Sequence, residues 1–254
     1  MSPARAIVTG ASSGIGLACA EALAKSGRPL LLAARRRDRL EELAGRLRSE
    51  HDVDVAFDEL DVRDRPAVDA WAEARADLLA ESRVLVNNAG LARGLDALPA
   101  GSVDDWDEML DTNVKGLLNV TRRVVPHFVT AGAGDVVNIG SVAGRWVYPK
   151  GAVYCASKHA ERAINEGLRL DLNGTGVRVA TVDPGMVETE FSLVRFHGDD
   201  AKADSVYDGM TPLSAEDVAA TVAWIVDRPA HVNVAELVLL PTDQASPTVV
   251  HRRK

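Results

Sequence analysis

The sequence predicts a single α/β domain, residues 1–254, built on a parallel sheet of about seven strands with helices on both faces. The main observation is that short apolar runs alternate along the chain with longer stretches in which apolar residues recur every three or four positions. This alternation is typical of right-handed strand–helix–strand crossovers, which make the strands run parallel. A hydrophobic content of 46% in 254 residues is enough for one large core, and no Pro/Gly/Ser-rich linker divides the chain.

The predicted strands are short runs rich in Val, Leu, Ile and Ala, as expected for strands buried on both faces. They are residues 6–9, 30–34, 53–57, 84–87, 136–139, 177–182 and 237–240. The predicted helices are residues 15–26, 38–50, 66–80, 104–131, 153–173 and 215–226. The last helix begins at a capping pair, Ser214 and Asp217. Together these elements indicate a doubly wound, Rossmann-type sheet, which binds ligands at the carboxyl ends of its strands.

One segment departs from the alternation. Residues 191–212 carry mixed charge and aromatic side chains, contain no predicted strand, and lie between the sixth strand and the last helix. We expect this segment to form a small lid over the substrate.

The composition excludes several classes of function. A net charge of −8 argues against a nucleic-acid partner, which usually requires a basic face. The two cysteines, Cys19 and Cys155, fall in different predicted helices and indicate neither a metal site nor a disulfide framework. No apolar run approaches the ~20 residues that span a bilayer, and residues 1–9 lack the pattern of a secretion signal. We therefore expect a cytoplasmic protein, not embedded in a membrane, that acts on a small molecule.

The turn between the first strand and the first helix is rich in glycine. Residues 9–16 read Thr-Gly-Ala-Ser-Ser-Gly-Ile-Gly, which brings backbone N–H groups and the positive end of a helix dipole together. Because glycine lets the backbone approach a ligand closely, this turn can bind the pyrophosphate of a dinucleotide. Alone, it could equally be a tight connection. The candidate cofactor residues in it are Gly10, Ser12, Ser13, Gly14, Ile15 and Gly16.

The residues after the second strand predict which dinucleotide binds. An acidic side chain here would accept bonds from the adenosine ribose hydroxyls and repel a 2′-phosphate, but Ala34 takes this position. Arg35 and Arg36 follow, and guanidinium groups bind phosphate through paired hydrogen bonds. We therefore expect NADP(H) rather than NAD. The alternative is that these arginines form a solvated basic start to a helix.

Tyr154 and Lys158 are four residues apart, so on a helix their side chains project from the same face. A nearby ammonium and the positive nicotinamide would stabilise the tyrosine phenolate. The tyrosine could then donate a proton to a carbonyl oxygen or remove one from an alcohol, with Ser141 hydrogen-bonded to the same oxygen. A Tyr-x-x-x-Lys pair alone usually reflects packing on a helix surface, so this prediction depends on its context.

That context is a set of motifs in a fixed order. They are the Gly-x-x-x-Gly-x-Gly turn at 10–16, Asn87-Asn88-Ala89-Gly90, Asn113, Ser141, Tyr154-x-x-x-Lys158 and Pro184-Gly185. Through them nearly the whole chain resembles the short-chain dehydrogenase/reductase family. The resemblance implies an enzyme that moves a hydride between nicotinamide and a carbonyl or alcohol, with Tyr154 as its acid and base.

The resemblance also implies roles for individual residues. Lys158 would hold the nicotinamide ribose, and Asn113 would continue a water-linked proton path. Asp61 and Val62 would flank the adenine, although Asp61 could equally be a turn residue. The remaining implied cofactor contacts are Asn88, Ala89 and Gly90 on the nicotinamide side, and Pro184, Gly185, Met186, Val187 and Thr189 near the carboxamide.

The C-terminal third is similar to one branch of the family, the NADP-dependent 3-hydroxy acid dehydrogenases that act on L-allo-threonine and serine. The resemblance lies in the strings at residues 184–192, 194–203, 229–233 and 240–242. It implies a homotetramer, and a small substrate such as L-allo-threonine, serine or 3-hydroxypropionate.

A hydroxy acid requires recognition of its carboxylate. Arg145 and Arg195 are the candidates, because a guanidinium matches a carboxylate through two parallel bonds and both residues lie near the expected lid. Either arginine could instead belong to an exposed or intersubunit salt bridge. Two other functions remain open: a broad-specificity aldehyde and ketone reductase, which could include sulfonate semialdehydes, and an NADP sensor without turnover.

Overall fold

The computed structural model describes residues 3–253. Its centre is a seven-stranded sheet in the order β3-β2-β1-β4-β5-β6-β7, and all neighbouring strands are parallel. The strands are β1 (Arg5–Thr9), β2 (Leu30–Ala34), β3 (Val55–Glu59), β4 (Ser82–Asn87), β5 (Gly134–Ile139), β6 (Val177–Pro184) and β7 (Glu236–Leu239). The strand order reverses between β1 and β4, as in doubly wound sheets. The predicted Rossmann-type fold is confirmed.

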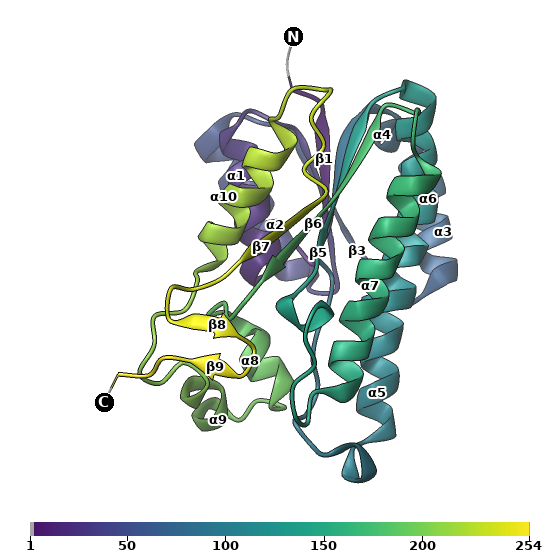
Figure 1. The fold of residues 1–254 in the computed structure, drawn as a ribbon. Helices are drawn as coiled ribbons and strands as arrows, with labels where there is room; N and C mark the ends of the chain where they lie inside the picture. The colour runs from purple at the N-terminus through teal and green to yellow at the C-terminus, as the bar shows by residue number, and fades with distance from the viewer. Residues whose placement is uncertain (1–2, 254) are drawn as a thin grey trace.

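Helices cover both faces of this sheet (Figure 1). One layer consists of α1 (Gly14–Lys25), α2 (Arg37–His51) and α10 (Ala215–Val226). The other consists of α3 (Arg65–Ala74), α4 (Ala76–Glu81), α5 (Val103–Leu110), α6 (Leu117–Ala131) and α7 (Ala152–Asp171). The three-residue 3-10 turns are η1 (Leu98–Ala100) and η3 (Val142–Gly144). No helix within residues 3–253 is long and apolar enough to cross a membrane.

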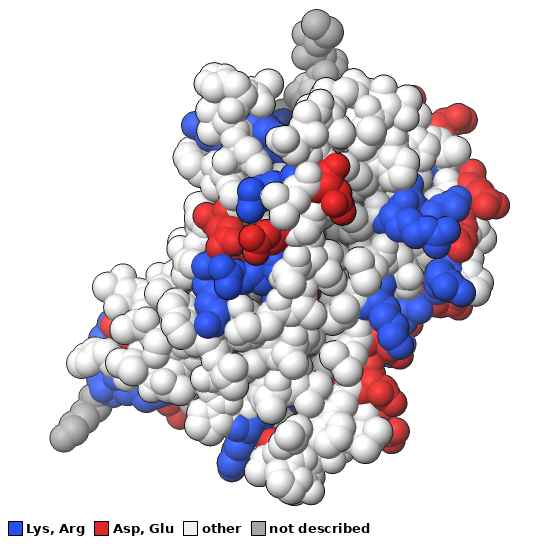
Figure 2. Space-filling view, turned by 45° about the vertical axis from the view of Figure 1, so that its right-hand side comes forward, with Lys and Arg blue, Asp and Glu red and all other residues white. Residues whose placement is uncertain are grey.

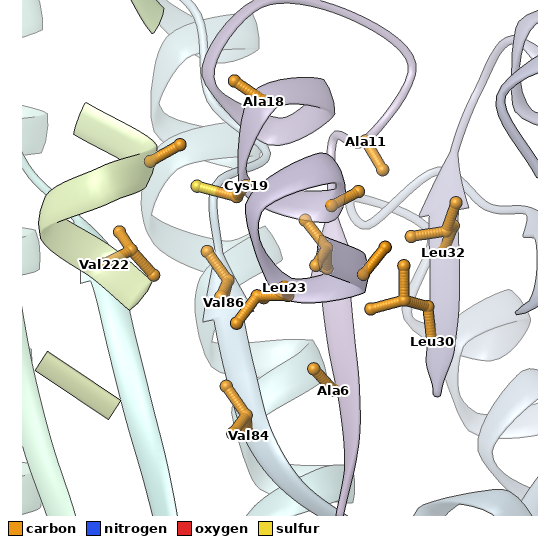
Figure 3. Close-up of a cluster of buried hydrophobic side chains, with 14 of the residues drawn as sticks. Ala6, Ala11, Ala18, Cys19, Leu23, Leu30, Leu32, Val84, Val86 and Val222 are labelled. Atoms are coloured by element: carbon orange, nitrogen blue, oxygen red, sulfur yellow. The ribbon is translucent and has the colours of Figure 1, made fainter. Parts of the chain in front are cut away.

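The central strands are buried on both sides because successive side chains point to opposite faces. On β1, Ala6 and Val8 join the core beneath α1 and α10, whereas Ile7 joins the core on the opposite face. Figure 3 shows the first core, where Leu23 and Cys19 of α1 and Val222 of α10 lie over the sheet. This alternation explains why the strands read as continuous apolar runs.

Two predicted helices are interrupted. The segment predicted at 66–80 divides at Arg75 into α3 and α4. The segment predicted at 104–131 contains a π-helical turn, η2 (Asp111–Gly116), between α5 and α6. A Cβ on Gly116 would lie 2.5 Å from Cγ2 of Val62, so glycine permits this close approach. The turn includes Asn113, which is fully buried, and π-turns often occur at functional sites.

The segment after β6 contains two short helices that the sequence did not predict, α8 (Glu190–Arg195) and α9 (Asp200–Ser205). A hairpin of β8 (Gln244–Ser246) and β9 (Val249–Val250) lies beside them at the C-terminal end (Figure 1). Arg253 fastens this end of the chain, because its N–H donates to Gly209 O and its guanidinium pairs with Asp243.

Charged side chains of both signs are spread over the face shown in Figure 2, where no continuous basic stripe is visible.

Candidate active site

The carboxyl ends of the strands border a cleft of about 580 Å³, a volume suited to a cofactor or a small ligand. Most of the predicted site residues line it. They are Gly10, Ser12, Ser13, Gly14, Ile15, Arg35, Arg36, Asp61, Val62, Asn88, Ala89, Gly90, Ser141, Tyr154, Lys158, Pro184, Gly185, Val187 and Thr189. The predicted site residues that do not line it are Gly16, Asn113, Arg145, Met186 and Arg195.

The glycine turn after β1 needs glycine for conformation and for space. Gly10 has a φ of +64°, and a Cβ there would lie 2.7 Å from Nδ2 of Asn88. The Asn88 amide donates to the carbonyls of Thr9 and Gly10 and so fixes the turn. A Cβ on Gly16 would lie 2.4 Å from Gly10 O, so a side chain at position 16 would clash with the backbone of the turn.

The same turn fits the pyrophosphate of a dinucleotide. Gly14 opens α1, and a Cβ there would lie 3.3 Å from Cβ of Thr189, which lies across the cleft. Because Gly14 has no side chain, the backbone at the N-terminus of this twelve-residue helix borders the cleft directly. Such a helix end presents free N–H groups and a positive dipole to an anion. The residues present therefore fit the expected cofactor.

Arginines gather at the end of the cleft beside β2. The Arg36 guanidinium donates to Ser12 Oγ at 3.2 Å, to Ser13 Oγ at 2.5 Å and to Glu190 Oε2 at 2.8 Å. Arg35 is half-exposed and lies 3.9 Å from Glu108. Ala34 offers no carboxylate here, and Arg35 and Arg36 line this end of the cleft together with the acidic Glu190. Guanidinium groups are well suited to binding a phosphate.

The sequence reasoning missed Arg63, which lines the same end of the cleft. Its guanidinium donates to Asp61 Oδ2 at 2.6 Å, and these hydrogen bonds hold the pKa of the Asp61 carboxyl below its usual range. The available signal was its position two residues after Asp61, in the turn that follows β3. Asp61 therefore faces the cleft as an ion-paired carboxylate.

Tyr154 and Lys158 enter the opposite end of the cleft from α7, and Ser141 enters from the turn after β5. Tyr154 and Lys158 are both buried. The Ser141 hydroxyl accepts a bond from the Ala143 N–H at 3.1 Å, which orients it at the start of η3. The Lys158 ammonium donates to Ile139 O at 3.1 Å and to both carboxylate oxygens of Glu161. Sequence reasoning did not identify Glu161.

Asn113 lies behind this group. Its amide donates to Leu91 O at 2.9 Å and to Ser157 Oγ at 3.0 Å, and its oxygen accepts from the Leu91 N–H. A Cβ on Gly90 would lie 3.3 Å from Asn113 Oδ1 and 3.6 Å from Lys158 Nζ. The backbone of Gly90 thus lies close to both the Asn113 and the Lys158 side chains.

The two arginines considered for a substrate carboxylate have different surroundings. Arg145 donates to Asp183 at 2.6 Å and to Glu236 at 2.5 Å, and it does not line the cleft. Both carboxylates come from strands of the same subunit, β6 and β7, so Arg145 is committed to a salt bridge within the sheet. The structure does not place it where it could meet a substrate.

Arg195, at the end of α8, is surrounded by aromatic rings. Its guanidinium carbon lies 5.1 Å from the ring centre of Tyr154, and similar contacts reach Tyr148 and Phe191. One nitrogen donates to Tyr148 Oη at 2.5 Å, while Nε is buried with no partner. Arg195 lines a small cavity together with Tyr154, Asp96 and Asp105, and within residues 3–253 neither of these carboxylates forms an ion pair with it.

Comparisons with known proteins agree with this geometry. A family model described as short chain dehydrogenase matches residues 4–198. The chain is 49% identical over 242 residues to sulfoacetaldehyde reductase 2 of Chromohalobacter salexigens, with 94% of each chain covered. It is 42% identical over 249 residues to an NADP-dependent 3-hydroxy acid dehydrogenase of Schizosaccharomyces pombe, covering 98% and 96%. The closed form of a serine dehydrogenase complexed with NADP+ superposes with a TM-score of 0.90 at 40% identity, covering 98% and 100%.

Proposed function

The chain belongs to the short-chain dehydrogenase family and is an NADP-dependent oxidoreductase, and from this premise we propose that its substrate is a small molecule carrying an acid group. The substrate would be a 3-hydroxy acid such as L-allo-threonine, serine or 3-hydroxypropionate, or a semialdehyde with a carboxylate or sulfonate. The reaction would transfer a hydride to or from the carbon that bears the oxygen.

One observation carries this proposal: the Arg195 guanidinium lies beside Tyr154 and has no acidic partner within the described residues. A buried guanidinium nitrogen without an acceptor is costly, and an anionic ligand would supply one. The aromatic rings around Arg195 hold it in place, and Asp96 and Asp105 line the same small cavity without forming an ion pair with it.

The names of the relatives support the same chemistry. Sulfoacetaldehyde, 3-hydroxy acids and serine are the substrates named for the matched proteins, and each is a small molecule with an acid group next to a short carbon chain. The common feature is the acid group rather than its identity, so we leave the choice between carboxylate and sulfonate to experiment.

In the proposed mechanism, the side chains of this protein transfer the proton and stabilise the groups that hold it. Bound NADP(H) supplies or accepts the hydride. We assign the proton transfer to the Tyr154 hydroxyl, which would donate to a carbonyl oxygen during reduction and accept from the alcohol during oxidation. Ser141 would donate a hydrogen bond to the same oxygen. The Lys158 ammonium would stabilise the phenolate, and Asn113 would hold the Leu91 backbone beside a water-linked proton path.

The cofactor would lie along the cleft. We assign the pyrophosphate to the turn around Gly10, Ser13 and Gly14, and the 2′-phosphate to Arg35 and Arg36. The adenine would rest against Asp61 and Val62, and the ribose next to nicotinamide would bond with Lys158. The carboxamide would meet the backbone and side chains of residues 184–189.

Residues 191–212 would serve as the substrate lid, since α8 carries both Arg195 and the cleft-lining Phe191. We also propose a homotetramer, as the family resemblance implies. Exposed apolar side chains on α5 and α6, including Leu110, Leu118 and Val129, provide surface for such contacts. Light scattering of the purified protein tests the assembly.

A substrate panel tests the proposed function. NADPH and NADH consumption would be followed with malonate semialdehyde, sulfoacetaldehyde, and neutral aldehydes and ketones of the same length. NADP+ reduction would be followed with serine, L-allo-threonine and 3-hydroxypropionate. The proposal requires the highest kcat/KM on a substrate with an acid group. A neutral carbonyl as the best substrate would favour a broad-specificity reductase, and cofactor binding without turnover would favour a sensor.

A further inference from the structure

Glu161 is a buried carboxylate hydrogen-bonded to Lys158, and the proposed reaction gives it no role. Glu161 follows Lys158 by three residues on α7, and its side chain is only 4% exposed. Both of its oxygens accept bonds from the Lys158 Nζ, at 2.8 and 2.9 Å. A buried carboxylate is unfavourable without such a partner. Lys158 and Glu161 therefore form a closed, buried ion pair.

The position of Lys158 is fixed by two elements at once. Its Nζ donates to Ile139 O at the end of β5, and to Glu161 one turn farther along α7. The side chain must pass from the helix toward the cleft that Tyr154 also lines. Glu161 and the Ile139 carbonyl thus fix the position of the ammonium.

The charges around this pair come from two neighbouring elements. On α7, Tyr154 faces Lys158, and on β6, Asp183 faces both Lys158 and Glu161. Asp183 accepts bonds from Thr181 Oγ1 at 2.8 Å and from Arg145 Nε at 2.6 Å, so its charge is offset by its own partner. Glu161 is therefore the carboxylate that acts most directly on the Lys158 ammonium.

We propose that Glu161 is a positioning residue that anchors the Lys158 ammonium and limits how strongly this ammonium acts on Tyr154. An ammonium paired with a carboxylate stabilises a nearby phenolate less than an unpaired one does, because the two charges partly cancel. Burial raises the pKa of the Glu161 carboxyl to about 7, against the opposing effect of Lys158. The degree of cancellation would then change with pH in the neutral range. This inference rests on the proposed roles of Tyr154 and Lys158.

Glu161→Gln tests it, because the amide keeps the size and one acceptor but removes the charge. The first readout uses the protein without cofactor or substrate: the ultraviolet difference absorbance of tyrosinate is followed as pH rises. The chain has three tyrosines, and subtraction of a Tyr154→Phe titration isolates Tyr154. Burial raises the pKa of Tyr148 to about 12, which separates its signal at high pH.

The proposal expects the Tyr154 absorbance step in Glu161→Gln to move to lower pH by about one unit. The lower limb of kcat/KM for alcohol oxidation should move in the same direction. Glu161→Asp, which withdraws the charge by one methylene, should give a smaller shift in that direction, and it serves if the Gln variant does not fold. Glu166→Gln, the same change on the exposed side of α7, should shift neither readout.

No shift in either Glu161 variant, or a shift to higher pH, would overturn the proposal and leave Glu161 a purely structural residue. The tyrosinate titration requires no substrate, so it also separates this proposal from the proposed function. Failure of the proposed function would instead appear as a neutral carbonyl being the best substrate in the substrate panel, a result on which the tyrosinate titration does not depend.

Discussion

The Arg36 guanidinium bonds Glu190 Oε2 at 2.8 Å, and Glu190 is the first residue of α8. The arginine assigned to the 2′-phosphate is thus connected to the helix that carries Arg195. Together with Arg39, Arg36 holds the pKa of the Glu190 carboxyl below its usual range. Glu190 therefore links the arginine that we propose binds the 2′-phosphate to the helix that carries the arginine that we propose binds the substrate.

Replacing Arg36 with Ala should weaken NADPH binding by roughly tenfold to a hundredfold, the expected loss for a charge-assisted bond. Affinity for NADH should change far less, because NADH lacks the phosphate. Fluorescence titration with each cofactor measures both effects. Arg39→Ala is the matched control: it loses the same Glu190 contact but does not line the cleft. Equal losses for both cofactors in Arg36→Ala would rule out phosphate recognition.

Tyr154→Phe should lower kcat/KM by roughly a hundredfold or more in both directions, since it removes the only proposed proton donor at the substrate oxygen. The ring and its edge-on contact with Phe191 at 5.8 Å should persist. NADPH affinity should stay within about threefold of that of the unmodified protein. Steady-state measurement of kcat/KM in both directions checks the first expectation, and retained activity would refute the assignment.

The pH dependence of stability should report the buried carboxyl of Glu161. Its pKa is raised from 4.5 to about 7, so the folded protein holds a proton that the unfolded chain has lost between these values. The stability that this group contributes is present at low pH and is lost as pH rises toward 7. The free energy of unfolding in urea, compared between pH about 5 and about 8, should fall less in Glu161→Gln than in the unmodified protein.

Two other carboxylates, Asp61 and Glu190, affect how the stability of the fold changes at acidic pH. Arg63 holds the pKa of Asp61 down, and Arg36 and Arg39 do so for Glu190, so these carboxylates stabilise the fold above their ordinary pKa values. Their contribution is lost as pH falls through the lowered values.

The neutral range tests Glu161 separately. A pH dependence of stability for Glu161→Gln identical to that of the unmodified protein across the neutral range would contradict the assignment to Glu161.

Arg145→Ala should destabilise the fold by about 3 kcal/mol, because it leaves the buried Asp183 carboxylate without its partner. The same change should not alter the preference for acidic over neutral substrates, since Arg145 lines neither the cleft nor the small cavity that Arg195 shares with Tyr154. Urea unfolding and a two-substrate comparison check the two parts. A selective loss of acidic substrates would return Arg145 to the substrate site.

Much of the fold and most of the cleft could be predicted because they depend on local patterns. The apolar runs marked the strands, and the carboxyl ends of parallel strands converge, so residues such as Gly10, Asn88 and Ser141 had to lie near one another. A resemblance carried by ordered motifs then supplied the cofactor class. These signals do not require knowledge of how the helices pack.

The remaining features depend on contacts between distant segments. Arg145 meets Asp183 and Glu236, which lie 38 and 91 residues away, so a candidate substrate ligand is held by the sheet instead. In the sequence, Glu161 cannot be distinguished from an exposed charged residue, because its burial depends on how α7 packs in the fold. The π-turn around Asn113 arises where Gly116 meets Val62. Such pairings cannot be read from periodicity alone.

We propose that Arg195 recognises the acid group of the substrate. Malonate semialdehyde and propanal have the same carbon count and differ in the carboxylate, so the ratio of their kcat/KM values isolates this contact. In Arg195→Ala we predict a roughly tenfold to hundredfold fall for malonate semialdehyde and a change within about threefold for propanal, with part of the ratio restored in Arg195→Lys. Equal falls for both aldehydes in Arg195→Ala would contradict the account.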